Sequence, residues 1–217
     1  MQNRRLRFLI LTFLCAFGLS KANSQFDNAK WQYYGKYSYG FVDKTQYSYG
    51  GFTLEKQIRP NWTLNWNFEL QHRKDGIFQI HGSMGLIGGP AFMGWSINNG
   101  TLGNGYVAGS ILLGLMIMAA PDGVSYHIPL AYRWDLSPYV NLLGFDWVQY
   151  TESQGLKYLM YSASAGVRCS YWFSDRLFAK AFVETRKAGP LGWNLGGGLA
   201  LGWSKPFSKM EKEQIGR

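Results

Sequence analysis

The stretch Trp62-Thr63-Leu64-Asn65-Trp66-Asn67-Phe68-Glu69-Leu70-Gln71 decides the fold. Large apolar side chains occupy every second position, and polar side chains occupy the positions between them. Because successive side chains of a strand point to opposite faces, the stretch predicts a strand with one apolar and one polar face. About ten tilted residues also cross the hydrocarbon layer of a membrane, where this alternation has to continue from end to end. The pattern is therefore typical of one strand of a transmembrane β-barrel.

The same alternation recurs along the rest of the chain. We expect an all-β, transmembrane, antiparallel up-and-down β-barrel whose apolar faces contact lipid and whose polar faces line the interior. The expected strands are Trp31–Phe41, Tyr47–Ile58, Trp62–Gln71, Ile77–Ile87, Val124–Trp134, Tyr139–Tyr150, Tyr158–Phe173, Arg176–Arg186 and Leu191–Trp203. Short turns are expected at Arg59–Asn61, Asp135–Pro138 and Ser174–Asp175, all on one rim of the barrel.

The number of strands depends on the segment between Gln71 and Val124. If this segment contains no spanning strand, the barrel has eight strands. If Ile77–Ile87 and a partner within Ala91–Ala120 both span, the barrel has ten. Both counts are compatible with an up-and-down barrel, because single-chain barrels of this kind have an even number of strands.

An apolar insertion near 91–120 interrupts the alternation. Tyr106 to Ala120 is nearly all apolar without a period of two, and Pro121-Asp122-Gly123 ends it. A helix of this length is about 22 Å long, too short to span a membrane comfortably. We expect an apolar helix or irregular element that lies against the barrel or in the outer leaflet. A buried tenth strand is the alternative.

The N-terminus has the three parts of a secretory signal. Arg4, Arg5 and Arg7 precede an apolar run from Phe8 to Leu19, and the small residues of Ala22–Ser24 form a cleavage site. The expected parts of the chain are the signal peptide at 1–24, the barrel at 25–207 and a polar C-terminal tail at 208–217.

Composition and charge fit this class. Aromatic residues make up 17% and charged residues 16% of the chain. Without the four basic residues of the signal, the 22 Lys and Arg fall to 18 against 13 acidic residues, and no basic cluster indicates nucleic acid. Cys169 is the only cysteine after the signal, so no internal disulfide is possible.

The signal, the alternating aromatic strands and the near-terminal Trp203 and Phe207 resemble the small outer-membrane β-barrels of Gram-negative bacteria, the OmpA/OmpX-like group. The Gly- and Tyr-rich style is similar to barrel proteins of Bacteroidetes. The resemblance implies a location in the bacterial outer membrane, contact with membrane lipids and lipopolysaccharide, and insertion by the barrel-insertion machinery. Family barrels usually finish on the terminal aromatic, whereas ten residues follow Phe207 here.

Charged residues fall on the polar faces of the expected strands. Because charges removed from water need partners, we expect a mixed ionic network along the lumen. Such a network either plugs the barrel or lines a narrow, ion-selective path. The residues expected in the network are Lys36, Glu55, Glu69, Arg168, Lys180, Glu184 and Arg186.

Two His/Ser pairs are the candidate catalytic residues. His81 with Ser83, and Ser125 with His127, each place a base and a nucleophile two apart on one strand face. His81-Gly82-Ser83 resembles the His-x-Ser element of PagL-type lipid A deacylases, in which Glu69 or Asp146 would orient the base. The alternation points both pairs into the lumen, away from lipid chains.

No cofactor is expected, since no His/Cys cluster has metal-ligand spacing and no glycine loop has a phosphate-binding context. We therefore expect a non-enzymatic barrel with a structural, adhesive or small-solute role. The alternatives are a PagL-like lipid A deacylase and a membrane scaffold that holds an unknown protein partner through the apolar insertion.

Overall fold

The computed structural model describes Phe26 and residues 29–42, 45–83, 89–90, 93–94, 104–150, 157–188 and 192–208. The expected signal peptide and residues 209–217 of the expected tail lie outside the described residues. The elements are β1 (Ala29–Val42), β2 (Thr45–Arg59), β3 (Trp62–Arg73), β4 (Ile77–Ser83), α3 (Asn104–Met118), β5 (Gly123–Tyr126), β6 (Ile128–Ala131), β7 (Trp134–Tyr150), β8 (Lys157–Trp172), β9 (Leu177–Ala188) and β10 (Trp193–Pro206).

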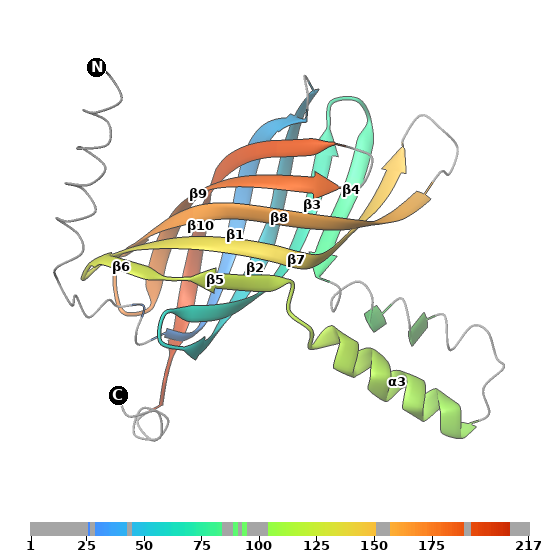
Figure 1. Cartoon of the computed structure of the whole chain (residues 1–217), viewed down its shortest axis with the longest axis horizontal. Helices are drawn as coiled ribbons and strands as arrows, with labels where there is room; N and C mark the ends of the chain where they lie inside the picture. Colours follow the sequence, from blue (N-terminus) through green and yellow to red (C-terminus); the bar gives the residue numbers. More distant parts are fainter. Residues whose placement is uncertain are drawn as a thin grey trace, which may run out of the picture.

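The strands form one antiparallel sheet that closes into a barrel (Figure 1). β1 pairs along its length with β2 on one side and with β10 on the other, so the first and last strands seal the ring. The remaining neighbours follow in chain order through β3, β7, β8 and β9. Closure gives every strand of the ring a neighbour on both sides, and β6 pairs with β7 alone.

The ring has eight strand positions, because β4 and β5 share one of them. β4 pairs with Phe68–His72 of β3, whereas β5 pairs with Trp62–Asn65 of the same strand. Both short strands also pair with β7, and β6 continues along β7 after β5. The prediction of eight strands is therefore confirmed, and the alternative of ten is wrong.

Two sequence-based boundaries are wrong for the same reason. Val124–Trp134 is not one complete wall strand but β5 and β6, and Ile77–Ile87 supplies β4 only up to Ser83, with residues 84–87 outside the described residues. Each segment alternates like a full strand, but each covers only half of the wall position. The alternation shows which face a residue lies on but not how far the strand extends. Two half-strands that share one wall position therefore look like two full strands.

The expected turn at Asp135–Pro138 is also wrong. The chain turns at Tyr132–Arg133, and Asp135 already lies in β7 with its side chain buried in the lumen. Pro138 is tolerated inside β7, opposite Val167 of β8, because its other side faces the interruption between β5 and β6. The turns at Arg59–Asn61 and Ser174–Asp175 are confirmed.

The two faces of β3 and β10 are as the alternation predicts. In β3 the apolar Trp62 and Leu70 are 42% and 44% exposed, whereas the polar Asn65 and Glu69 are 0% exposed. Leu199, on β10, is 70% exposed on the same outer surface. An apolar exterior around a polar interior is the reverse of a soluble protein and is typical of a barrel surrounded by lipid.

Aromatic pairs mark both ends of the outer surface. Near the chain termini, Tyr33 packs against Trp203 and Trp62 packs against Tyr126, with ring centroids 5.2 and 5.0 Å apart. At the opposite end, Phe145 packs edge-to-face against Tyr161. Aromatic girdles of this kind lie at the two membrane interfaces and frame the apolar band between them.

α3 lies outside the barrel, with its C-terminal end toward β5 and the rest of the helix projecting away from the wall (Figure 1). This confirms the predicted apolar helical insertion, and the alternative of a buried tenth strand is wrong. Among the described residues, no helix has both the length and the hydropathy needed to span a membrane.

Introducing Arg at Leu199, in the middle of β10, should prevent stable insertion, because Arg at the bilayer midplane costs about 2–4 kcal/mol on the lipid face. The matched control is Phe173→Arg. Phe173 directly follows β8 at the end of the barrel near the chain termini, where the cost falls to about 0–1 kcal/mol near the interface. Urea unfolding in lipid vesicles, followed by heat-modifiable migration on gels, measures both variants. Equal stability of the two variants would contradict the assignment of the lipid-facing band.

Candidate functional site: the lumen and the break in the wall

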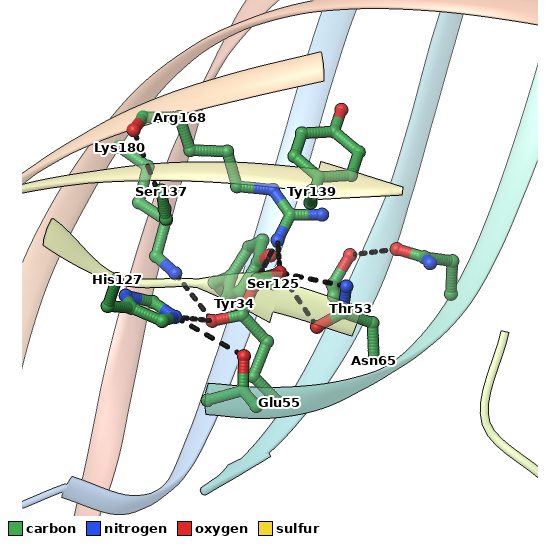
Figure 2. A network of polar contacts seen from close by, with 12 residues as sticks. Tyr34, Thr53, Glu55, Asn65, Ser125, His127, Ser137, Tyr139, Arg168 and Lys180 are labelled. Carbon is green, nitrogen blue, oxygen red and sulfur yellow. Dashed lines mark hydrogen bonds and ion pairs between the residues drawn. The ribbon is translucent and has the colours of Figure 1, made fainter. Parts of the chain in front are cut away.

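Glu55 of β2 joins four strands inside the half of the barrel nearer the chain termini (Figure 2). Lys180 Nζ of β9 donates to Glu55 Oε2 at 2.8 Å, and the Tyr34 hydroxyl of β1 donates to Oε1 at 2.7 Å. Arg168 of β8 forms an ion pair with the same carboxylate. None of the four side chains belongs to a residue more than 4% exposed. Because β2 and β8 stand opposite each other in a ring of eight positions, the Glu55–Arg168 pair crosses the barrel.

Arg168 is held by neighbours on both sides. Its guanidinium carbon lies 3.6 Å from the ring centroid of Tyr139, and its Nη1 donates to Ser125 Oγ at 3.1 Å. Ser125 is itself bonded to Asn65, whose Nδ2 donates to Ser125 Oγ at 2.9 Å. A planar guanidinium stacked on an aromatic ring keeps a fixed direction, which favours its pairing with Glu55.

Glu69 is the centre of a second cluster, farther from the termini. Arg186 Nη2 donates to Glu69 Oε2 at 2.5 Å, and Lys36 pairs with the other carboxylate oxygen. Arg186 also pairs with Glu184 at 2.7 Å, and the Tyr139 hydroxyl donates to the other oxygen of Glu184, again at 2.7 Å. β3 and β9 also stand opposite each other in the ring, so the Glu69–Arg186 pair is a second connection across the lumen.

Two histidines each face an aspartate. His127 Nδ1 lies 3.0 Å from Asp135 Oδ2, and Trp172 Nε1 donates to the other oxygen of this carboxylate at 2.9 Å. His81 Nδ1 lies 2.8 Å from Asp146 Oδ1. Counting these pairs, each of the six carboxylates buried in the described interior has a hydrogen-bond donor or a basic partner.

Phe26 covers the polar interior at the end that carries the termini. Its ring stacks on His127 with centroids 3.7 Å apart and planes 10° apart, and the residue is only 1% exposed. It belongs to a buried apolar cluster that includes Ala29 and Trp172. This end of the lumen therefore holds an apolar layer beneath the charged clusters.

The wall is broken between Ser83 and Gly123, and Asp122 fills the break. The backbone N–H of Asp122 donates to Asn65 O at 2.7 Å, and its carbonyl accepts from the amides of Leu142 and Leu143, both at 2.9 Å. Its carboxylate Oδ2 accepts from the backbone N–H and the side-chain Nδ2 of Asn67 at 2.8 and 2.7 Å. A side chain thus supplies the acceptor that a continuous neighbouring strand would otherwise provide.

Neither of the two comparisons of sequence, with protein-family models and with curated proteins, finds a match. Among solved structures, the N-terminal β-barrel domain of Pseudomonas aeruginosa OprF matches with a TM-score of 0.50 and 13% identity, covering 81% of this chain and 98% of that one. The fold is that of a small outer-membrane β-barrel. The predicted fold class and the predicted resemblance to small outer-membrane barrels are confirmed at this level.

Two further matches have lower TM-scores. Ail, the attachment invasion locus protein of Yersinia pestis, was solved with a heparin analogue and matches with a TM-score of 0.41 and 9% identity, covering 83% of this chain and 99% of that one. The outer membrane protein OprG of Pseudomonas aeruginosa matches with a TM-score of 0.41 and 6% identity, covering 82% of this chain and 94% of that one.

All seven side chains expected in the lumen network lie inside the barrel, each in at least one ion pair. These residues are Lys36, Glu55, Glu69, Arg168, Lys180, Glu184 and Arg186. Sequence reasoning did not include Tyr34, Tyr139, Asp122 or Asp135. Tyr34 follows the aromatic Tyr33, Asp122 follows Pro121, and Asp135 and Tyr139 lie in or next to a segment that Pro138 makes look like a turn. Their partners in the lumen therefore come only from the strand register.

The candidate catalytic His/Ser pairs are buried, and their hydrogen bonds differ from those of a catalytic triad. His81 contacts Asp146 and Ser162 Oγ through the same Nδ1 atom, whereas a nucleophile–base–acid relay uses both ring nitrogens. Ser125 bonds to Asn65 and Arg168 instead of to His127. Among the described residues, no group of three or more His, Cys, Asp or Glu could hold a metal ion.

Replacing Glu55 by Gln should destabilise the barrel by about 3–5 kcal/mol, because it leaves Arg168 and Lys180 buried without their shared anion. The double variant Glu55→Gln/Lys180→Met is the control and should recover part of this loss, since one unpaired cation is removed with the carboxylate. Urea unfolding in vesicles, followed by tryptophan fluorescence, gives the free energies of unfolding. A single variant as stable as the wild type would show that the pairing is dispensable.

Replacing Asp122 by Ala should cost about 1–3 kcal/mol of unfolding free energy, because the Asn67 N–H would be left without an acceptor in the wall. Asp122→Asn keeps one side-chain oxygen and should cost less. The same unfolding measurement compares the two variants. If both lose the same stability, the negative charge and not the acceptor oxygen stabilises the break.

Proposed function

We propose that this protein is a closed outer-membrane β-barrel with a structural role, and that it is neither an enzyme nor an open pore. One observation carries the proposal: ion pairs join opposite walls of the ring at two levels. Glu55 reaches Arg168, and Glu69 reaches Arg186. A solute on the barrel axis would have to separate these pairs in a medium where unpaired charge is costly.

Additional contacts support a filled interior. The hydroxyls of Tyr34 and Tyr139 donate hydrogen bonds to Glu55 and Glu184. The guanidinium of Arg186 lies over the ring of Tyr49. Barrels of eight strands have just enough interior space for their own side chains, whereas larger barrels leave channels. The lumen is then the core of the protein, with polar instead of apolar packing.

The outer surface supports contact with membrane lipids. Exposed apolar residues such as Leu199 and Leu201 lie between aromatic girdles, as hydrocarbon requires. An outer-membrane location would bring part of this surface into contact with lipopolysaccharide, and the barrel-insertion machinery would assemble it there. A partner protein held through the insertion, or adhesion at the cell surface, remains a competing role for the same closed barrel.

The closed lumen can be tested by conductance. Purified wild-type protein in a planar bilayer should give no current steps, and Phe26→Ala should also give none, because the Glu55 and Glu69 clusters lie beyond the phenylalanine. A porin added to the same bilayer is the positive control, and heat-modifiable migration verifies that the barrel is folded. Reproducible steps with the folded wild-type protein would favour the small-solute role instead.

A further inference from the structure

The sequence from Ile77 to Pro121 contains no Asp, Glu, Lys or Arg. The stretch starts with β4, contains α3 and ends immediately before Asp122, where the chain re-enters the wall. Extramembrane loops of comparable length usually carry charge, because charged side chains are mostly exposed to water. A segment of this length without charged side chains is therefore better suited to an apolar environment than to water.

α3 exposes apolar side chains around most of its circumference. The exposed side chains are Ile111, Leu112, Leu113, Leu115 and Met116. With 3.6 residues per turn, these positions spread over about 200° of the helix surface. Gly114 lies on the remaining side and is buried, and a Cβ there would collide with Met93 and lie close to the backbone of Gly89. An apolar sector this wide exceeds the stripe of about 100° that a water-exposed helix buries, and it fits a helix that lies in a protein core or in a membrane.

The chain re-enters the wall inside the apolar band of the barrel. Trp62 belongs to the girdle near the termini, and the break faces Asn65 and Asn67 on the same strand. From Trp62 to Trp66 is about 13 Å along the strand at ~3.3 Å per residue. An apolar band about 25 Å tall therefore includes the level of the break.

Four backbone carbonyls at the C-terminal end of α3 accept hydrogen bonds from within the protein. The Trp66 indole N–H, on the outer surface of β3, donates to Ala119 O at 3.2 Å. Ala119 N donates to Leu115 O and Met116 O, both at 3.2 Å, and Ala120 N donates to the carbonyl of residue 117 at 2.9 Å. Pro121 follows and has no N–H to satisfy. A helix end normally leaves several carbonyls unpaired, which hydrocarbon does not tolerate.

The length of α3 fits one leaflet. Its 15 residues give about 22 Å of helix at 1.5 Å per residue. Half of a hydrocarbon layer of about 30 Å is ~15 Å, which a helix of this length crosses at a tilt of about 45°.

We propose that α3 is immersed in the hydrocarbon of one leaflet, where lipid acyl chains are its partner, and that Asp122 and Trp66 anchor it to the barrel wall. The proposal rests on the membrane position of the barrel given under the proposed function. It assigns the insertion to the lipid-contacting surface, so that the β3–β7 side of the barrel presents a helix to lipid in addition to its strands.

Site-specific fluorescence tests the immersion. In the full chain with Cys15→Ala and Cys169→Ala, a single cysteine at Leu112 or Met116 is labelled with a polarity-sensitive fluorophore, and the protein is folded into phosphatidylcholine vesicles. Two quenchers are compared: phosphatidylcholine brominated on its acyl chains, and aqueous iodide. Labels at Leu199 and at Arg176 serve as references for lipid and for water, and heat-modifiable migration confirms folding of each variant.

Labels at Leu112 and Met116 should be quenched by brominated acyl chains, like Leu199, and should lose the iodide quenching that Arg176 retains. Iodide quenching at both positions, with Leu199 still quenched by lipid, would overturn the proposal while leaving the membrane barrel intact. Quenching by neither agent would also overturn it and would indicate that a second copy of the chain covers α3. Iodide quenching at Leu199 as well would instead contradict the proposed membrane position.

Discussion

The structure depends on one constraint: inside hydrocarbon, every backbone N–H and C=O has to find a partner within the protein. Ring closure meets this constraint for most of the wall, since β1 joins β10 along its whole length. The constraint is hardest to meet where the fourth wall position is divided between β4 and β5. There the backbone and carboxylate of Asp122 bond to both neighbouring strands, so the wall stays closed although its strand does not.

The polar side chains of the interior are under a similar constraint. Charges held out of bulk water require partners, and the described lumen supplies them across the ring and not only between neighbours. Glu55 and Glu69 each receive two basic side chains, and at least one of these comes from the opposite side of the barrel. These contacts fix the relative positions of strands that share no backbone hydrogen bonds. A polar core of this kind depends on geometry, because each charge is stabilising only when it is paired.

The insertion shows how a barrel can depart from the regular pattern without exposing its backbone. α3 lies outside the ring (Figure 1), the chain re-enters the wall at Asp122, and the indole of Trp66 donates to the carbonyl of Ala119 just after the helix. The indole of Trp66 therefore contributes an apolar ring to the outer surface and a hydrogen-bond donor to the insertion. The same strand, β3, thus meets the break with polar groups on its inner face and with an aromatic donor on its outer face.

The sequence by itself determined the class of fold, the two faces of regularly alternating strands such as β3, and the seven charges of the lumen, because alternation is a local property that needs no knowledge of partners. The register and the neighbours of each strand came only from the tertiary structure. Alternation could not reveal that β4 and β5 fill one wall position, since a half-strand alternates like a whole one. Asp135, three residues before Pro138, looked like the start of a turn, although it lies in β7 opposite Ser170 and contacts His127. Asp122 looked like the end of a helix, and only the approach of Asn65, Asn67 and Leu142 from two other strands makes it the residue that closes the wall. Pairing across a barrel depends on shear and closure of the whole ring, and these are not encoded in any single segment.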